Sequence, residues 1–277
     1  MRGRYIIKTL VLITTMVLSA FFCAAQQSKA EVEADTLVAQ QEYSKALDIY
    51  SKLIGKSKMK TEEDFQLYYK RSVCYYGLEN YTAALADINV VIEKFPQPQA
   101  KLLRAYINQE LGDYDALLDD LNEIIALNPG SPELIQWRAS VNMEAGNYPE
   151  ARQDITTLLN YQSLPELKAM LGLSYYYQED SDSAIVIFDE LLRENPAYLQ
   201  GYIYAASLSL DEEAYELALS YINKGLEQDP GNATLIFYKG IALIETEQEK
   251  EGCRCLTQAF NAGVDDVADY LKQYCYQ

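Results

Sequence analysis

The sequence predicts an all-α chain built from consecutive helical hairpins. Glycine and proline are sparse, with 13 and 8 among 277 residues, and strand-like alternation of apolar and polar residues is almost absent. A self-similar segment also recurs at a fixed interval along most of the chain. Fixed periods of roughly 20 to 50 residues are typical of arrays in which each repeat is one small supersecondary unit. We therefore expect stacked hairpins.

Two independent features share the same period. One is a turn position that is tyrosine in most copies, with intervals of 33, 34, 33, 34 and 34: Tyr81, Tyr114, Tyr148, Ser181, Tyr215 and Glu249. The other is a small residue in each preceding helix, which repeats at the same intervals: Ser72, Ala105, Ala139, Gly172, Ala206 and Gly240. Small residues at these positions let paired helices approach closely. The shared interval therefore predicts a helix–turn–helix unit.

These positions and their spacing resemble the tetratricopeptide repeat, a helix–turn–helix unit of about 34 residues. The resemblance implies a right-handed superhelical solenoid in which the first helix of each repeat lines the concave face. About seven repeats are expected, at 30–55, 64–97, 98–131, 132–163, 165–198, 199–232 and 233–263, followed by a capping helix at 265–275. Their paired helices are expected at 30–41 and 43–55, 64–78 and 80–94, 98–111 and 114–127, 132–145 and 148–160, 165–178 and 181–194, 199–212 and 215–228, and 233–246 and 249–262.

The first 25 residues have the order of a signal peptide. Basic residues between Met1 and Lys8 precede an apolar stretch at 9–22, and small residues end at Ala25. The apolar stretch is shorter than the roughly 20 residues that cross a bilayer. We expect cleavage after Ala25 and export of the 26–277 solenoid.

The export pattern leaves the compartment and the membrane contact open. Our expectation is the periplasm or cell envelope of a Gram-negative bacterium, although the same pattern fits eukaryotic secretion. A retained anchor is one alternative. Lipidation of Cys23 is another, but Phe22 departs from the small residue that the lipoprotein motif requires. The chain would be membrane-associated only in these two cases.

Composition argues against several functional classes. The net charge is −18, from 23 Lys+Arg and 41 Asp+Glu, and this sign repels nucleic acid. No histidine is present, which removes the commonest general base and metal ligand. No phosphate-binding, dinucleotide-binding or nucleophile-elbow motif occurs. We expect a protein that is not an enzyme and has no cofactor and no metal. Two carboxylates that point into one cleft would instead favour a hydrolase.

The resemblance places a binding groove for a protein or peptide on the concave face. Tyrosine, with an apolar body and a polar tip, suits a partly wet interface, and interleaved acids favour a partner bearing Lys or Arg. Too few basic residues occur there for the carboxylate clamp of the chaperone-binding members. An alternative is a small-molecule or glycan-binding carrier or sensor, which requires an enclosed pocket. The partner-binding candidates are Tyr69, Tyr76, Tyr106, Gln136, Met143, Glu144, Glu166, Tyr176, Tyr177 and Phe237.

Cysteines outside the signal segment suggest one disulfide. Cys253 and Cys275 lie at similar distances from the expected turn near Gly263, so antiparallel helices would bring them level. The hypothesis is a Cys253–Cys275 disulfide that clamps the capping helix, with Cys255 as the alternative partner of Cys275. Cys74 is expected to be a buried apolar residue. A metal site made of three cysteines without histidine is less favoured.

Overall fold

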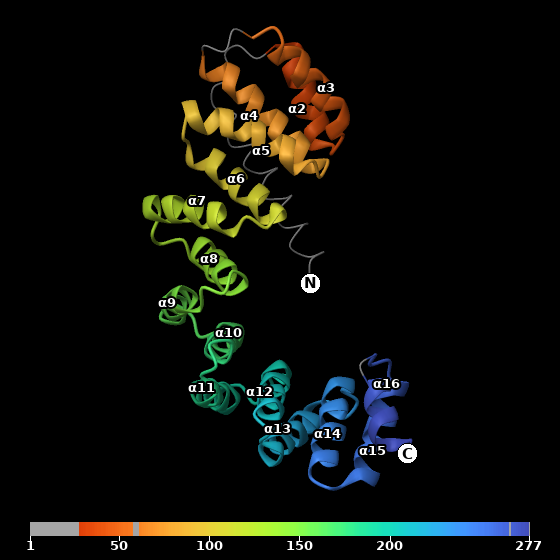
Figure 1. Ribbon diagram of the computed structural model, residues 1–277. Helices are drawn as coiled ribbons and strands as arrows, with labels where there is room; N and C mark the ends of the chain where they lie inside the picture. Colours follow the sequence, from red (N-terminus) through yellow and green to blue (C-terminus); the bar gives the residue numbers. More distant parts are fainter. Residues whose placement is uncertain (1–27, 58–60, 266, 277) are drawn as a thin grey trace. The chain divides into compact units, whose positions relative to one another are not determined.

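The computed structural model describes residues 28–57, 61–265 and 267–276 (Figure 1). Every regular element among these residues is helical, as the sequence predicts. None of the described helices is long and apolar enough to span a membrane. The expected signal peptide, 1–25, lies outside the described residues. The chain divides into two compact units, the first ending at Gly130 and the second beginning at Ser131.

The helices pair into hairpins whose bounds lie within two residues of those expected. The first unit contains α2 (Lys29–Ala39) and α3 (Tyr43–Ile54), α4 (Glu62–Gly77) and α5 (Tyr81–Lys94), and α6 (Pro98–Leu111) and α7 (Tyr114–Leu127). The second contains α8 (Pro132–Glu144) and α9 (Tyr148–Leu159), α10 (Pro165–Tyr176) and α11 (Ser181–Glu194), α12 (Leu199–Asp211) and α13 (Tyr215–Gln228), and α14 (Ala233–Glu245) and α15 (Glu249–Asn261). The expected cap is the short helix α16 (Val267–Tyr270), which continues into the π-helical turn η1 (Leu271–Cys275).

Local sequence explains where many of the helices begin. Thr61 and Asp64 form a reciprocal capping box at the start of α4, which satisfies two backbone N–H groups that have no partner inside the helix. The side chains of Asn80, Asp113 and Asp180 accept a backbone N–H in the same way at α5, α7 and α11. Proline occupies the first position of α6, α8 and α10, where a missing N–H has no cost.

Each turn within a hairpin needs one residue with left-handed backbone geometry. Gly112 and Gly146 supply it with φ of 73° and 79°. Glutamate occupies the same position in four other hairpins, with φ of 58°, 61°, 56° and 62° at Glu79, Glu179, Glu213 and Glu247. A residue with a Cβ is strained in this region, so these turns are maintained by the packing of the helices on either side.

The small residues of the repeat lie where the two helices of a hairpin cross. Four of them are fully buried, namely Ser72, Ala105, Ala139 and Ala206. In the other two hairpins the space is tighter. A Cβ on Gly172 would lie 2.9 Å from the ring of Phe188, and one on Gly240 would lie 2.6 Å from the side chain of Leu256. The repeat therefore needs a small residue at this position because the facing helix fills the space.

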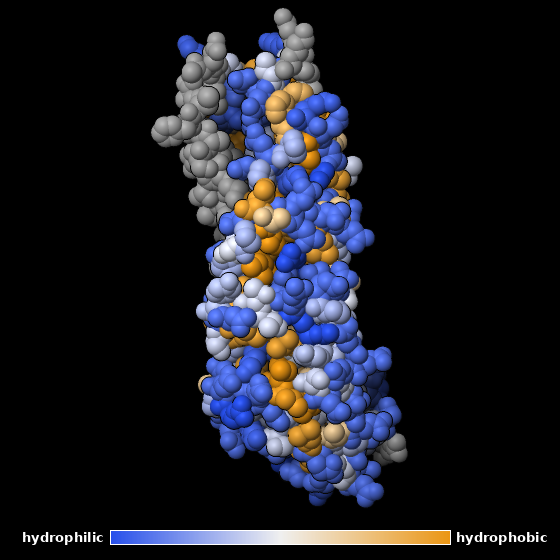
Figure 2. All heavy atoms as spheres, turned by 90° about the vertical axis from the view of Figure 1, so that its left-hand side faces the viewer, coloured by the Kyte–Doolittle hydropathy of each residue, from blue (hydrophilic) through white to orange (hydrophobic). Residues whose placement is uncertain are grey.

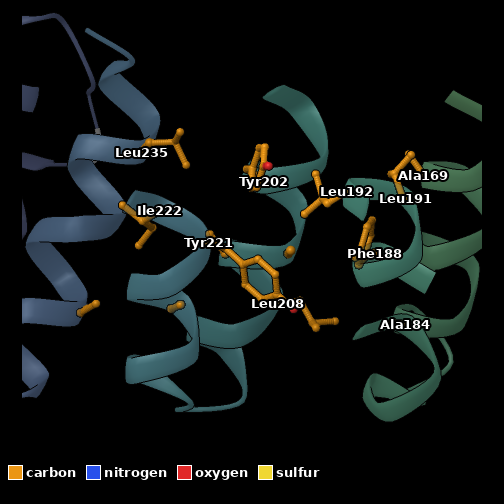
Figure 3. Packing of buried hydrophobic residues seen from close by; sticks show 14 residues of the cluster. Ala169, Ala184, Phe188, Leu191, Leu192, Tyr202, Leu208, Tyr221, Ile222 and Leu235 are labelled. Atoms are coloured by element: carbon orange, nitrogen blue, oxygen red, sulfur yellow. The ribbon is translucent and has the colours of Figure 1, made fainter. Parts of the chain in front are cut away.

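Larger apolar residues form cores between successive hairpins. Figure 3 shows the core that joins α10 to α14, where Phe188, Leu191 and Leu208 are almost completely buried. Tyr202 and Tyr221 are buried in the same cluster. Each hairpin thus covers an apolar face of its neighbour, as expected for a repeat array.

Three hairpins carry the same buried ion pair between their two helices. Arg71 donates to both carboxylate oxygens of Asp87, at 2.7 and 2.8 Å. Arg104 makes the same fork with Asp120 and Arg138 with Asp154, at 2.7 to 2.8 Å. The aspartate side chains are at most 8% exposed. Bidentate pairs of this kind fix the relative position of the two helices.

Candidate functional site

Neighbouring first helices approach one another more closely than neighbouring second helices do. In the first unit α4 touches α6, and in the second α10 touches α12 and α12 touches α14. No pair of second helices touches to the same extent among the described residues. A stack of hairpins curves toward the side whose helices lie closer together, so the first helices form the inner side of each unit. The candidate surface is therefore described on the first helices.

In the first unit, tyrosines gather around one carboxylate at the ends of α4 and α6 and the start of α5. The rings of Tyr76 and Tyr81 meet edge to face, with centroids 5.6 Å apart. Burial, followed by the charge of Glu110, raises the pKa of both tyrosines. Tyr106 contributes to the same rise at Tyr76. Glu110 is exposed. The result is an aromatic surface with a carboxylate at its edge.

The second unit repeats this arrangement around Asp211. The Tyr176 hydroxyl donates to the Asp211 carboxylate at 2.5 Å, and this bond, followed by burial, raises the pKa of Tyr176 to about 12. The neighbouring ring of Tyr177 lies 5.4 Å from that of Tyr176 and stacks on Tyr148, with centroids 5.7 Å apart. Tyr177 remains 53% exposed. Aromatic faces and a carboxylate are again available to solvent together.

One packing relation recurs beside these clusters, in addition to the Tyr176–Asp211 hydrogen bond. In this relation, the tyrosine at the turn position of one hairpin lies against a residue of the next hairpin. That residue is four positions before the next hairpin's own turn position. Tyr148 stacks on Tyr177, and the Glu245 carboxylate raises the pKa of Tyr215, after burial. In the first unit burial, and then the Glu110 charge, raise the pKa of Tyr81. The Tyr43 ring occupies the space where a Cβ on Gly77 would lie. We call the solvent-facing members the tyrosine–acid row: Tyr81 and Glu110 in the first unit, and Tyr148, Tyr176, Tyr177, Asp211, Tyr215 and Glu245 in the second.

The sequence-predicted site residues have different exposures. Four are exposed, namely Gln136, Glu144, Glu166 and Tyr177. Five are partly buried, namely Tyr69, Tyr76, Tyr106, Met143 and Tyr176. Burial raises the pKa of Tyr69 to about 12, so that side chain belongs largely to the packing.

The expectation for Phe237 needs correction. This residue is only 8% exposed and belongs to the core beneath the cap, where its ring meets Tyr270 edge to face at 5.4 Å. The cap covers the apolar end of the last hairpin, so Phe237 is not available to a partner. Sequence position alone placed it in the groove because the residues that cover it lie 30 or more positions later.

The turn tyrosines Tyr81, Tyr148 and Tyr215 were missed as surface residues. The signal was present in the sequence, since these tyrosines set the repeat period, but the period alone does not show which of them reach solvent. Their partners lie about one repeat later in the chain, so neither a local motif nor a single helix shows the pair. Only the stacking of hairpins brings each one to the next hairpin's carboxylate or ring.

The basic residues near the first helices are already paired. The Lys70 ammonium donates to Glu31 at 2.7 Å and to Asp35 at 2.9 Å. Arg71 and Arg104 are held by Asp87 and Asp120. The carboxylates at the hairpin turns therefore dominate the charge that the row presents to a partner.

Cysteine placement matches the sequence hypothesis. The structure joins Cys253 of α15 to Cys275 of η1 by a disulfide, with Cα atoms 5.7 Å apart. Cys74 is fully buried, and burial raises the pKa of its thiol to about 12. Cys255 is a free, partly exposed thiol. The disulfide ties the cap to the last hairpin.

The described residues hold no group of three or more side chains that could ligate a metal ion. Two shallow hollows lie on their surface, and neither is lined by a residue of the tyrosine–acid row. One, of about 540 Å³, is lined by residues between Glu247 and Arg254, and the other, of about 320 Å³, lies between α10 and α11.

Comparison with known proteins identifies the repeat. The tetratricopeptide repeat family model matches residues 32–98, in the first unit, and 169–233, in the second. The C-terminal part of a repeat-containing protein of this type from Cytophaga hutchinsonii superposes with a TM-score of 0.64 at 20% identity, covering 86% of this chain and 97% of that one. A tetratricopeptide repeat protein from Parabacteroides merdae superposes with a TM-score of 0.57 at 17% identity, covering 89% and 96%. These likenesses show the fold.

A curated relative is similar over part of the chain. DnaJ homolog subfamily C member 3 from Gallus gallus is 25% identical over 130 residues, which is 47% of this chain. The match spans only 22% of the length of that relative. The period of the turn tyrosines, the small residues at each helix crossing and the family-model matches agree, and the chain contains tetratricopeptide repeats in both of its units.

Proposed function

We propose that this protein is a non-enzymatic scaffold that binds a peptide or protein segment bearing Lys or Arg along the tyrosine–acid row. The observation that carries the proposal is the cluster in the second unit. There the exposed ring of Tyr177, stacked on Tyr148, lies beside the Tyr176–Asp211 pair. Tetratricopeptide repeats generally serve as interaction scaffolds, which supports the coarse function.

The chemistry of the row suits a cationic side chain. A guanidinium or ammonium group is attracted to the face of a tyrosine ring, and a neighbouring carboxylate can accept its hydrogen bonds. The Tyr176 hydroxyl occupies one oxygen of Asp211, Oδ2, and fixes the orientation of the carboxylate. Because the second unit carries one acid at Asp211 and another at Glu245, on successive hairpins, two cations of an extended segment could each find a carboxylate within this unit.

A small-molecule or glycan carrier has no specific observation in its favour. That function calls for an enclosed pocket lined by convergent polar groups. The two hollows of the described residues named above are shallow, and neither is lined by a residue of the row.

We also propose that the chain acts after export, in the cell envelope. The support is the order of basic, apolar and small residues in the first 25 positions. A disulfide between Cys253 and Cys275 suits an oxidising compartment.

The binding proposal is tested with an array of random peptides, followed by fluorescence anisotropy of the best binders. We expect the best binders to be rich in Lys or Arg. Tyr177→Ala should weaken them about tenfold, and Asp211→Asn about two- to fivefold. Binding should also weaken as salt is raised, because the contact is between charges near the surface.

Matched controls separate the row from general surface chemistry. Tyr161→Ala removes a tyrosine that is 77% exposed in the turn after α9, and Glu227→Gln removes an exposed carboxylate in the last turn of α13. Both should leave the affinity unchanged. Acidic or uncharged best binders, or equal losses in the test and control variants, would contradict the proposal. Thermal denaturation of each variant checks that the fold is intact.

A further inference from the structure

The series of buried Arg–Asp pairs ends before the hairpin α10–α11. Arg71, Arg104 and Arg138 each pair with an aspartate 16 positions later. At the next repeat, 33 positions beyond Arg138 and Asp154, the two residues are Leu171 and Ile187. Both are partly exposed. Two apolar side chains thus occupy the place where the three preceding hairpins carry a charged pair.

The residue beside Ile187 continues this apolar surface. Val186 is 56% exposed. The equivalent positions of the neighbouring second helices carry alanine, aspartate, glutamine and serine, namely Ala86, Asp119, Gln153 and Ser220. Figure 2 shows an orange strip of apolar atoms at the height of the helices α10 to α13, and another one above it on the same face. An exposed valine next to a partly exposed isoleucine is thus peculiar to α11 among these helices.

Val186 and Ile187 line a hollow in which a third lining side chain is held in place by its neighbours. The hollow has a volume of about 320 Å³, and its lining includes Tyr175, Val186 and Ile187. The Arg152 guanidinium lies 4.5 Å from the centroid of the Tyr175 ring and donates to the carbonyl oxygen of Ser174 at 3.1 Å. Tyr175 is therefore held in place, and the hollow is partly preformed.

The edge of the hollow is acidic. Asp182 lines it and is exposed, and Glu179 and Asp180 lie just before the start of α11. The nearest cation, Arg152, is engaged by the tyrosine ring and the carbonyl. Apolar contact area bordered by carboxylates complements a segment that is apolar on one face and basic at its flank.

We propose that Leu171, Tyr175, Val186 and Ile187 form a second docking site, which receives an amphipathic segment of a partner protein. One large aliphatic or aromatic side chain of the segment fills the hollow, and a Lys or Arg beside it pairs with Asp182. A second copy of this chain fits poorly, because each copy has a net charge of −18 and would bring the same carboxylates to the contact.

This site shares no residue with the tyrosine–acid row. It is centred on Val186 and Ile187 of α11, whereas the row consists of residues at the hairpin turns and on first helices. Because Tyr175 of the patch directly precedes Tyr176 of the row in α10, variants in both surfaces are compared below.

The test uses a random peptide library displayed on phage as the probe, selected on the full chain and then measured as free peptides by calorimetry. Selected peptides should combine a large apolar residue with a nearby Lys or Arg. Val186→Asp should weaken them about tenfold or more. Ser220→Asp, the matched change on α13, should have no effect.

A second variant guards against misfolding. The double substitution Leu171→Arg/Ile187→Asp recreates the ion pair of the three preceding hairpins, so the fold should be kept while the apolar surface is lost. It should abolish binding of the selected peptides with no loss of thermal stability. Asp211→Asn, in the tyrosine–acid row, should leave these peptides bound, which separates this site from the proposed function above.

Three results would overturn the docking site. One is failure to select peptides that compete for the patch. Another is selected peptides that bind both patch variants as well as the unchanged chain. The third is concentration-dependent dimerisation in sedimentation experiments that Val186→Asp abolishes, which would make the patch a contact between copies.

Discussion

Single residues at the hairpin turns carry a cost that the fold tolerates. Glu79, Glu179, Glu213 and Glu247 adopt the left-handed geometry that Gly112 and Gly146 adopt without strain. Their carboxylates lie at the same end of the hairpins as the tyrosine–acid row. We infer that glutamate is kept at these turns for its negative charge, although its strained backbone lowers the free energy of unfolding.

Glu179→Gly is expected to stabilise the protein by about 0.5–1 kcal/mol, because relief of the left-handed strain exceeds the added entropy of glycine in the unfolded chain. Urea denaturation followed by circular dichroism measures the change. Gly112→Glu is the reverse control and should destabilise by a similar amount, since no atom lies near enough to Gly112 to clash with a Cβ. A stability gain in both variants would rule out backbone strain as the cause.

At the level of the helix pair, the ion pairs and the small residues act together. The small residue sets the distance between the two helices, and the bidentate Arg–Asp pair fixes their relative position along the helix axes. Asp120 has a side chain only 1% exposed and depends on Arg104 for its partner, whereas Arg104 is 27% exposed. Loss of one partner should therefore cost more than loss of both.

Asp120→Ala should destabilise the first unit by roughly 2–3 kcal/mol, because it leaves the Arg104 guanidinium partly buried without its carboxylate. The double variant Arg104→Leu/Asp120→Ile copies the natural pair of α10–α11 and should lie within about 1 kcal/mol of the unchanged protein. Thermal denaturation measures both. If the double variant is as unstable as the single one, the apolar pair of α10–α11 is not an equivalent replacement.

The helix pairs were predictable because their signals are local. A proline at the first helical position, a small residue at the crossing and a tyrosine at the turn all lie within one repeat, as in Pro98, Ala105 and Tyr114. The site was less predictable. Tyr176 and Asp211 belong to successive repeats, and the Arg104–Asp120 pair joins two helices through side-chain geometry. Such pairs become visible only when equivalent positions of several repeats are compared.

At the scale of the whole molecule, the chain forms two compact units, and the described residues contain one covalent cross-link, which lies in the second unit. Hairpin arrays hold their ends less firmly than their middles, because an end hairpin has only one neighbour. At the C-terminal end, α16 and η1 cover the apolar core around Phe237 and Leu256. The disulfide keeps this small cover in place.

Cys275→Ser should destabilise the second unit by about 2–4 kcal/mol, because the loop between the two cysteines is no longer closed in the unfolded chain. Hydrogen exchange should rise in α15, α16 and η1 and stay unchanged in the first unit. Cys255→Ser is the control and should change neither quantity. Peptide mapping without reductant should recover Cys253 linked to Cys275, and recovery of Cys255 in that link would contradict the pairing.

The position of this cross-link also has a consequence for the order of assembly. Nearly all contacts of the array join residues within one repeat or the next, so each hairpin can fold as soon as it and its neighbour have been synthesised. The bond to Cys275 can form only after this residue has emerged, 22 positions later than Cys253. It therefore marks chains in which synthesis has passed residue 275, and a chain truncated before that residue would carry Cys253 as a free thiol above an uncovered apolar core.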